Sequence, residues 1–177
     1  MLRRSILVIV LAAAPAFAQS ATRSAPGSAT SEIRKAWETA RGYLMDAATE
    51  VPESTYAFRP TPDVRTFGEL IAHLAGAQDS FCAAALGEPA SREDAVEKTT
   101  TTKAALVDAL KKSSDHCARA YAMNDQEAAK PLGGSNGNES RLSMLVMNLT
   151  HDNEHYGNIV TYMRMNHMIP PSSKPRK

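Results

Sequence analysis

Residues 66–86, with the sequence TFGELIAHLAGAQDSFCAAAL, contain the clearest helix signal in the chain. Thr66 is a good N-cap, and Glu69 follows three residues later, which is the spacing of a capping box. Apolar residues then recur every three or four positions, and Gly87 is a stop signal. The apolar stripe comprises Phe67, Leu70, Leu74, Ala77, Phe81 and Ala84. The pattern predicts an amphipathic helix over 67–86 whose apolar face packs in a core.

Three further segments show helical spacing of apolar residues, namely Ser31–Glu50, Lys103–Met123 and Glu139–Met168. In the first of these, Ser31 stands where an N-cap belongs, and Pro52 follows as a stop signal. The last segment is apolar on more than one face, so we expect it to be the most buried helix.

No segment shows the sustained alternation of apolar and polar residues that a half-buried strand requires, so the predicted fold class is all-α. Four helices of about 20 residues suit a four-helix bundle. The connections at 52–65, 87–102 and 124–138 are long enough to cross the bundle. We therefore expect a four-helix bundle with crossover connections, and a simple up-down-up-down order is not required.

The composition is that of one ordinary globular domain. The chain has 177 residues, with 20 Lys and Arg against 19 Asp and Glu. This balance argues against nucleic-acid binding, which calls for a basic excess or stripe. Two cysteines are too few for a Cys-rich zinc site or a disulfide scaffold. Phosphate-binding loops and the G-x-S-x-G motif do not occur, so function has to be sought in local clusters.

Residues 1–18 match a secretory signal peptide. Arg3 and Arg4 provide the positive start, a short apolar run follows, and Ala16-Phe17-Ala18 is a cleavage pattern. The apolar run is shorter than the ~20 residues of a spanning helix, so an uncleaved anchor is the weaker interpretation. We expect a periplasmic or secreted protein without a membrane span after cleavage. The rest of the chain divides into a flexible lead-in, a bundle domain and a tail: 19–30, 31–173 and 174–177.

Export bears on the two cysteines, Cys82 and Cys117, because disulfides persist in oxidising compartments. Within one chain they can bond only to each other. Closing a loop of this length contributes about 3–4 kcal/mol, so we favour a disulfide between them. The alternative is two small, buried apolar side chains that do not meet.

The strongest chemical signal is the pair His151 and His155, four residues apart in the last predicted helix. Side chains at this spacing lie on one helix face, where two imidazoles can bind one metal ion. His73, beside the apolar stripe of the 67–86 helix, supplies a third imidazole if the two helices face each other. Three His ligands leave open positions for water or substrate, which is typical of a catalytic site. Hydrogen bonds between the imidazoles and Asn or Tyr neighbours are the alternative.

Imidazole ligands indicate a divalent metal ion, with zinc or nickel favoured, although iron and copper also accept them. The metalloprotease motif HExxH is not met, since Asp152 rather than Glu follows His151. Glu154 is a candidate general base or outer-sphere group, and its alternative interpretation is a surface carboxylate. We interpret His116 as a partly exposed polar residue and His167 as a structural residue near a helix end.

Three stretches of the chain, taken together, resemble one protein family. They are Tyr56–Pro62 (YAFRPTP), Thr66–His73 (TFGELIAH) and His151–Ile159 (HDNEHYGNI). The first resembles an aromatic-Arg-Pro lead-in, the second a helix with a first metal-binding His, and the third a final helix with two more. With Arg164 and Pro170-Pro171 at its end, the chain resembles the DinB (YfiT-like) superfamily from Ser31 to Ser173.

The resemblance implies a bundle with crossover connections and a metal site formed by His73, His151 and His155. It also implies an activity among the thiol-dependent transferases or metal-dependent hydrolases. Two features distinguish this chain from the thiol transferases. Tyr156-Gly157-Asn158 stands where the family commonly has Arg-Gly-Gln, and the predicted export contrasts with transferases that act in the cytosol.

We therefore predict an exported DinB-like protein that binds a divalent metal ion and hydrolyses an unidentified small molecule with metal-activated water. Asn148, Glu154 or Asn158 would orient the water or substrate, and the 124–138 loop would cover the opening. The alternatives are a metal-binding bundle without catalysis, a partner-binding bundle without metal, and a thiol-transferase-like enzyme. The sequence leaves open whether the bundle forms a homodimer.

Overall fold

The computed structural model describes residues 27–89, 92–133 and 139–175, so the predicted signal peptide at 1–18 lies outside the described residues. Within them the chain forms four long helices, α1 (Ala29–Glu50), α2 (Phe67–Leu86), α4 (Lys103–Ala120) and α6 (Arg141–Met165). Short elements connect or follow these helices: η1 (Glu53–Thr55), α3 (Ala95–Thr99), α5 (Asp125–Ala128) and η3 (Pro171–Ser173). In this part of the chain, β pairing is limited to an isolated bridge between Pro131 and Ser140. The predicted all-α class is confirmed.

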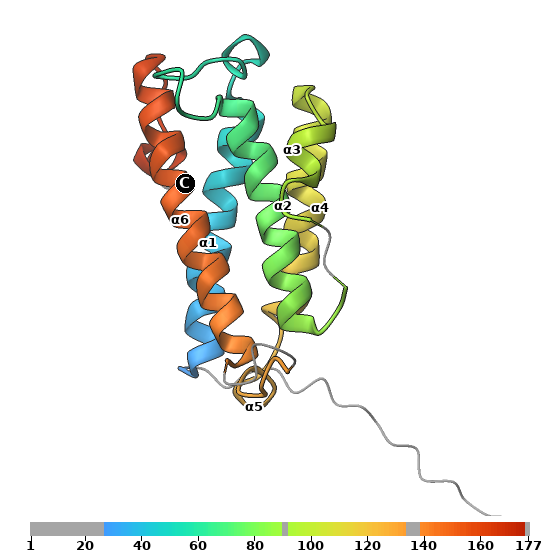
Figure 1. The fold of residues 1–177 in the computed structure, drawn as a ribbon. Helices are drawn as coiled ribbons and strands as arrows, with labels where there is room; N and C mark the ends of the chain where they lie inside the picture. The colour runs from blue at the N-terminus through green and yellow to red at the C-terminus, as the bar shows by residue number, and fades with distance from the viewer. Residues whose placement is uncertain (1–26, 90–91, 134–138, 176–177) are drawn as a thin grey trace, which may run out of the picture.

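The order of the long helices around the bundle differs from their order in the chain. Figure 1 shows α1 and α6 running in one direction and α2 and α4 in the other. Around the bundle the packed neighbours follow the order α1, α4, α2, α6 and back to α1. The consecutive helices α1 and α2 therefore lie diagonally, and α2 and α4 are parallel neighbours. Parallel neighbours need a return connection, which residues 87–102 with α3 provide, so the predicted crossover connections are confirmed.

The helix predicted over 67–86 begins and ends where its local signals place it. The Thr66 hydroxyl accepts a hydrogen bond from the Glu69 N–H at 3.1 Å, and the Glu69 carboxylate accepts one from the Thr66 N–H at 2.7 Å. Gly87 follows α2 with φ of 74°, a left-handed conformation that favours glycine. Local sequence therefore accounts for both ends of α2.

The most buried helix is α2, so the prediction that the last helix would be the most buried was wrong. In α2, 14 of 20 residues are buried, against 8 of 25 in α6. α2 packs on α3, α4 and α6, whereas α6 leaves Val146, Met147 and Met165 exposed. How extensively its neighbours pack on a helix decides the burial of that helix, and apolar content alone does not reveal it. None of the helices in the described ranges is long and apolar enough to cross a bilayer.

The other long helices differ from their predicted bounds at the ends. Ser28, and not Ser31, is the N-cap of α1, and residues 29–30 of the predicted lead-in are helical. Thr30 is buried, and its N–H and hydroxyl donate to the Asp125 carboxylate at 2.9 and 2.6 Å. This partner lies 95 residues away in sequence, so local signals could not indicate it. α4 and α6 are both shorter than the predicted segments.

A buried disulfide joins α2 to α4. Cys82 and Cys117 have their Cα atoms 5.1 Å apart, and both side chains are fully buried. The predicted pairing is confirmed. Beside it, the rings of Trp37 and Tyr121 stack with 4.3 Å between their centroids, which packs the start of α1 against the end of α4. The covalent link and this stacking together hold one end of the bundle.

Candidate metal centre

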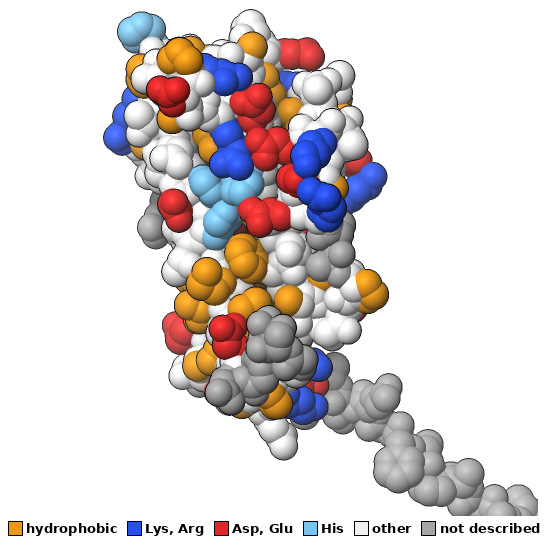
Figure 2. All heavy atoms as spheres, viewed as in Figure 1, with side chains coloured by type: hydrophobic (Ala, Val, Ile, Leu, Met, Phe, Trp, Pro, Cys, Tyr) orange, Lys and Arg blue, Asp and Glu red, His pale blue; other side chains and the backbone are white. Residues whose placement is uncertain are grey.

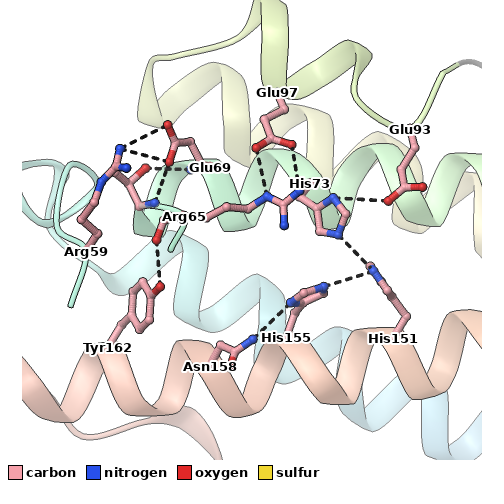
Figure 3. Close-up of polar contacts among 11 residues, drawn as sticks. Arg59, Arg65, Glu69, His73, Glu93, Glu97, His151, His155, Asn158 and Tyr162 are labelled. Atoms are coloured by element: carbon pink, nitrogen blue, oxygen red, sulfur yellow. Dashed lines mark hydrogen bonds and ion pairs between the residues drawn. The ribbon is translucent and has the colours of Figure 1, made fainter. Parts of the chain in front are cut away.

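Three histidines meet where α2 packs against α6 (Figure 3). His73 comes from α2, and His151 and His155 come from successive turns of α6. The Nε2 atom of His151 lies 3.1 Å from that of His73 and 3.1 Å from that of His155. The structure thus brings together the three predicted metal ligands, with one ligand atom from each within 4.8 Å of the others. We call this group the His cluster.

The spacing of the Nε2 atoms fits a shared metal ion. Zinc–nitrogen bonds of about 2.0–2.1 Å in a tetrahedral site place neighbouring nitrogen ligands about 3.3 Å apart. The two 3.1 Å separations are close to that value. Three nitrogens this close need a proton or a cation between them, because lone pairs that face one another repel.

Burial keeps the three imidazoles neutral. His73 and His155 are 8% and 9% exposed, and loss of solvent lowers the pKa of each to about 4. The next cause is the positive charge of Arg65 for His73 and the neighbouring imidazole of His151 for His155. Burial also lowers the pKa of His151. Neutral imidazole is the form that binds a metal, so the cluster is ready for an ion at neutral pH.

The outer nitrogens of the imidazoles have different surroundings. The Nδ1 of His73 lies 3.4 Å from a carboxylate oxygen of Glu93, and the Nδ1 of His155 lies 3.3 Å from the side-chain amide of Asn158. A carboxylate beside Nδ1 favours the tautomer with its proton there, which leaves the Nε2 lone pair free for a metal. The Nδ1 of His151 is buried and has no hydrogen-bond partner within the described residues.

Gly76 lets Glu93 approach His73. A Cβ atom at Gly76 would stand 1.9 Å from the Glu93 carbonyl oxygen, a distance that real Cβ atoms do not reach. The backbone before α3 therefore lies directly on α2, one turn after His73. This close approach fixes the Glu93 carboxylate beside the His cluster.

Two hollows flank the His cluster. The larger has a volume of about 710 Å³ and is lined by His155, Asn158 and Tyr162 together with residues 59–65. The smaller, of about 350 Å³, is lined by His73 and by the residues before α3. Arg65 and Glu97 line both hollows. Figure 2 shows the imidazoles at the surface among acidic and basic side chains, so the cluster is reachable from solvent.

Of the other residues predicted to act at the site, only some lie where they could do so. Asn158 is exposed and lines the larger hollow, as a substrate-orienting residue would. Asn148 does not, because it is fully buried and its amide donates to Tyr121 and Asp152. Glu154 is exposed on α6, and its role as a base stays a prediction. The carboxylate in contact with the cluster is that of Glu93.

The 124–138 loop, predicted to cover the opening of the site, also lies elsewhere in its described part. The described part of the 124–138 loop forms α5, which packs on α1 and α6 and lines neither hollow; residues 134–138 lie outside the described ranges. The walls come instead from residues 59–65 and from α3 with the turn before it. Both remaining histidines lie apart from the cluster, as expected: His116 is paired with Asp79 and Glu88, and His167 is exposed after the end of α6.

Sequence reasoning missed Arg65, Glu93 and Glu97. Arg65 immediately precedes the capping box of α2, and the other two lie in a connection predicted only as a loop. The available signal was Gly76 in the interior of α2. A helix interior disfavours glycine, so a glycine there indicates that another backbone approaches closely.

An all-α bundle with three histidines shared between two facing helices defines the class of this protein. The sequence model of the DinB superfamily matches residues 36–159, and the chain therefore belongs to the DinB superfamily. The fold is similar to the crystal structure of a candidate member of the DinB family from Exiguobacterium sibiricum 255-15. The TM-score is 0.61 at 16% identity, with 78% of this chain and 91% of that chain covered. A search of curated proteins found no match to the chain.

Proposed function

We propose that this protein binds one divalent metal ion through His73, His151 and His155 and uses it in a hydrolytic reaction. The proposal rests on the convergence of three neutral imidazoles, in which Nε2 of His151 lies 3.1 Å from Nε2 of both His73 and His155. Imidazole donors suit zinc or nickel. When bound, such an ion supplies a Lewis acid that polarises a substrate and lowers the pKa of water.

Residues around the cluster would orient the imidazoles. The Glu93 carboxylate lies 3.4 Å from Nδ1 of His73 and favours the tautomer with its proton there, which directs the Nε2 lone pair inward. The side-chain amide nitrogen of Asn158 lies 3.3 Å from Nδ1 of His155, where its N–H donates to that nitrogen and holds the plane of the ring. Glu93 thus favours, for His73, the tautomer that a metal requires.

The larger hollow supports catalysis over mere storage of an ion. Its volume of about 710 Å³ lies within the range of small-molecule pockets, ~300–1,000 Å³, and His155 forms part of its wall. A small molecule in this hollow would lie against the cluster. A storage site would instead enclose its ion with protein ligands on all sides.

We also propose that the protein is exported to the periplasm or secreted. Two features support this: the charged start, apolar run and Ala16-Phe17-Ala18 pattern of the signal sequence, and the buried disulfide between Cys82 and Cys117. Structural disulfides are rare in reducing compartments. Fractionation of the native producing cells tests this: mature protein that begins at Gln19 outside the cytoplasm is expected, and full-length cytoplasmic protein would contradict it.

Elemental analysis tests metal binding. Protein expressed with its own signal and purified without a metal-affinity tag is expected to contain close to one equivalent of a divalent metal ion. His73→Ala and His155→Ala should each lose it. His116→Ala is the matched control, because His116 is paired with carboxylates away from the cluster and should leave the metal content unchanged. No metal in the wild type, even after loading with zinc or nickel, would overturn the proposal.

Hydrolysis needs its own test, since a bound ion does not by itself make an enzyme. The wild type with its metal would be assayed on a panel of 4-nitrophenyl esters and phosphates beside His155→Ala. We expect turnover in the wild type that disappears in the variant and after chelation. A fully loaded protein without turnover on any member of the panel would favour the alternative of a metal-binding bundle without catalysis.

A further inference from the structure

Arg65 occupies an unusual position, between the two hollows and beside the His cluster (Figure 3). It comes just before α2, whereas the imidazoles project from α2 and α6. Figure 3 shows its guanidinium beside the ring of His73 and facing the side of α6 that carries His155.

Both ends of Arg65 are held in place. Its Nε and one terminal nitrogen donate to the two carboxylate oxygens of Glu97 at 2.9 and 3.4 Å. Its backbone carbonyl accepts a hydrogen bond from the Tyr162 hydroxyl at 2.8 Å. A two-point contact with a carboxylate fixes the plane of a guanidinium, so Arg65 is oriented before any ligand arrives.

The third guanidinium nitrogen, Nη1, remains available. Figure 3 shows it on the side of Arg65 that faces α6 and His155, away from Glu97. It makes no hydrogen bond within the described part of the chain, and Arg65 is partly exposed. A donor with a fixed direction therefore points into the space beside the His cluster.

The charges favour an anionic ligand at this donor. Glu97 balances the charge of Arg65, and the Glu93 carboxylate adds one negative charge beside His73. A divalent ion on the cluster would make the space between Nη1 and the imidazoles positive. An anionic oxygen there would interact with the guanidinium and the ion at once.

We propose that Arg65 is the anion-binding residue of this site and selects small substrates that carry a carboxylate or phosphate group beside the bond to be hydrolysed. The proposal rests on the proposed metal-dependent hydrolysis and names its substrate class. Arg65 binds the anionic oxygen through Nη1, while Glu97 holds the other edge of the guanidinium. Substrates without an anionic group are bound more weakly.

Titration with acetate and with inorganic phosphate tests this proposal. The NMR signals of the Asn158 side-chain amide, in the same hollow, report binding to the protein as purified and after metal removal. Metal content is measured on the same samples, so failure of the metal site and failure of anion binding are read separately. We expect a saturable shift of the Asn158 amide signals. A response to acetate alone, to phosphate alone or to both identifies the preferred anion.

Two substitutions of opposite effect distinguish binding from a structural role. Arg65→Gln is expected to weaken anion binding at least about tenfold, since it removes a charged hydrogen-bond donor. Glu97→Gln is expected to strengthen it, because a competing negative charge disappears. Arg41→Gln is the control, because Arg41 of α1 pairs with Asp115 of α4 and lines neither hollow, so this variant should bind anions like the wild type.

Three results would overturn the proposal. One is the absence of a saturable shift with either anion in the wild type, which needs no variant to fold. Another is unchanged anion affinity in folded Arg65→Gln. The third is weaker binding in both the Arg65 and the Glu97 variants, which would mean that the pair only holds α3 against α2.

Discussion

α6 carries two polar clusters that α2 completes, and they are built in opposite ways. The His cluster opens to two hollows, and its Nε2 atoms face one another with no other polar partner in the described residues. The second cluster is closed. Asp152, fully buried, accepts hydrogen bonds from Gln78 at 3.0 Å and Asn148 at 3.3 Å.

The closed cluster extends to the neighbouring helices. The Gln78 side-chain oxygen accepts from Ser113 and Ser114 on α4, and Asn148 also donates to the Tyr121 hydroxyl. Apart from the Asn148 carbonyl oxygen, these side-chain atoms find partners within the protein. The comparison indicates that the closed cluster sets the register of α2, α4 and α6, whereas the His cluster depends on a partner from outside.

Breaking the closed cluster should have the largest effect on stability. Asp152→Ala leaves buried donors on Gln78 and Asn148 without an acceptor, so we expect a loss of about 2–4 kcal/mol in the free energy of unfolding. Urea denaturation of metal-free protein measures it. Asp152→Asn, which keeps one acceptor, should cost less. His155→Ala, also metal-free, should change stability by less than Asp152→Ala, and the reverse order would contradict the comparison.

A methyl group added at Gly76, on the α2 side of the His cluster, should test whether the close approach of the Glu93 backbone contributes to stability. Gly76→Ala forces the backbone at Glu93 off α2, and we expect a loss of about 1–3 kcal/mol by overpacking. Gly157→Ala is the matched control: this helical glycine of α6 has open space around it, and alanine there should stabilise by about 0.5–1 kcal/mol. Equal effects of the two substitutions on thermal unfolding would show that the close approach at Gly76 is unimportant.

Removing the carboxylate beside His73 should weaken metal binding without abolishing it. Glu93→Gln loses the charged acceptor at Nδ1, and we expect about tenfold lower affinity, as for other residues that orient metal-binding histidines. Competition with a chromogenic chelator measures the affinity. Glu154→Gln is the control, because Glu154 is an exposed carboxylate on the same helix as two of the ligands. If both variants lose affinity equally, general electrostatics rather than the Glu93 contact is responsible.

The pH dependence of stability should show the smallest net effect, because the contributions of the two clusters have opposite signs and offset each other. Burial lowers the pKa of His73 and His155 to about 4. In metal-free protein these imidazoles therefore bind fewer protons in the folded state than in the unfolded state, and their contribution makes the free energy of unfolding rise between about pH 4 and 6.5. Burial raises the pKa of Asp152 to about 7. The folded state therefore binds more protons at this group than the unfolded state, and its contribution makes the free energy of unfolding fall between about pH 4 and 7.

Variants separate the two contributions to this pH dependence. Denaturation from pH 4 to 7 should show a steeper rise in Asp152→Asn than in the wild type, because the opposing group no longer titrates. In His155→Ala the rise should flatten. The same pH profile in all three proteins would mean that neither cluster controls it.

Much of the site could be predicted from sequence because its signals are local or unique. Thr66 and Glu69 fix the start of α2 through their own hydrogen bonds, and His151 and His155 share a face because of their spacing. Two cysteines in one chain allow a single intramolecular pairing. The burial order of the helices was mispredicted because it depends on contacts made far along the chain. The start of α1 was mispredicted because Ser28 and Ser31 are both suitable N-caps, and the Thr30 contact with Asp125 that lies beside the observed cap is 95 residues away in sequence.

The sequence by itself determined the all-α class, the bounds of α2, the pairing of Cys82 with Cys117 and the three histidines of the cluster. Only the tertiary structure decided that His73 meets His151 across 78 positions and that Glu93 and Arg65 join them. It also decided that Asn148 belongs to the closed cluster. The physical reason is that caps and helix faces depend on residues near in sequence, whereas contacts between residues far apart in sequence depend on how whole helices pack.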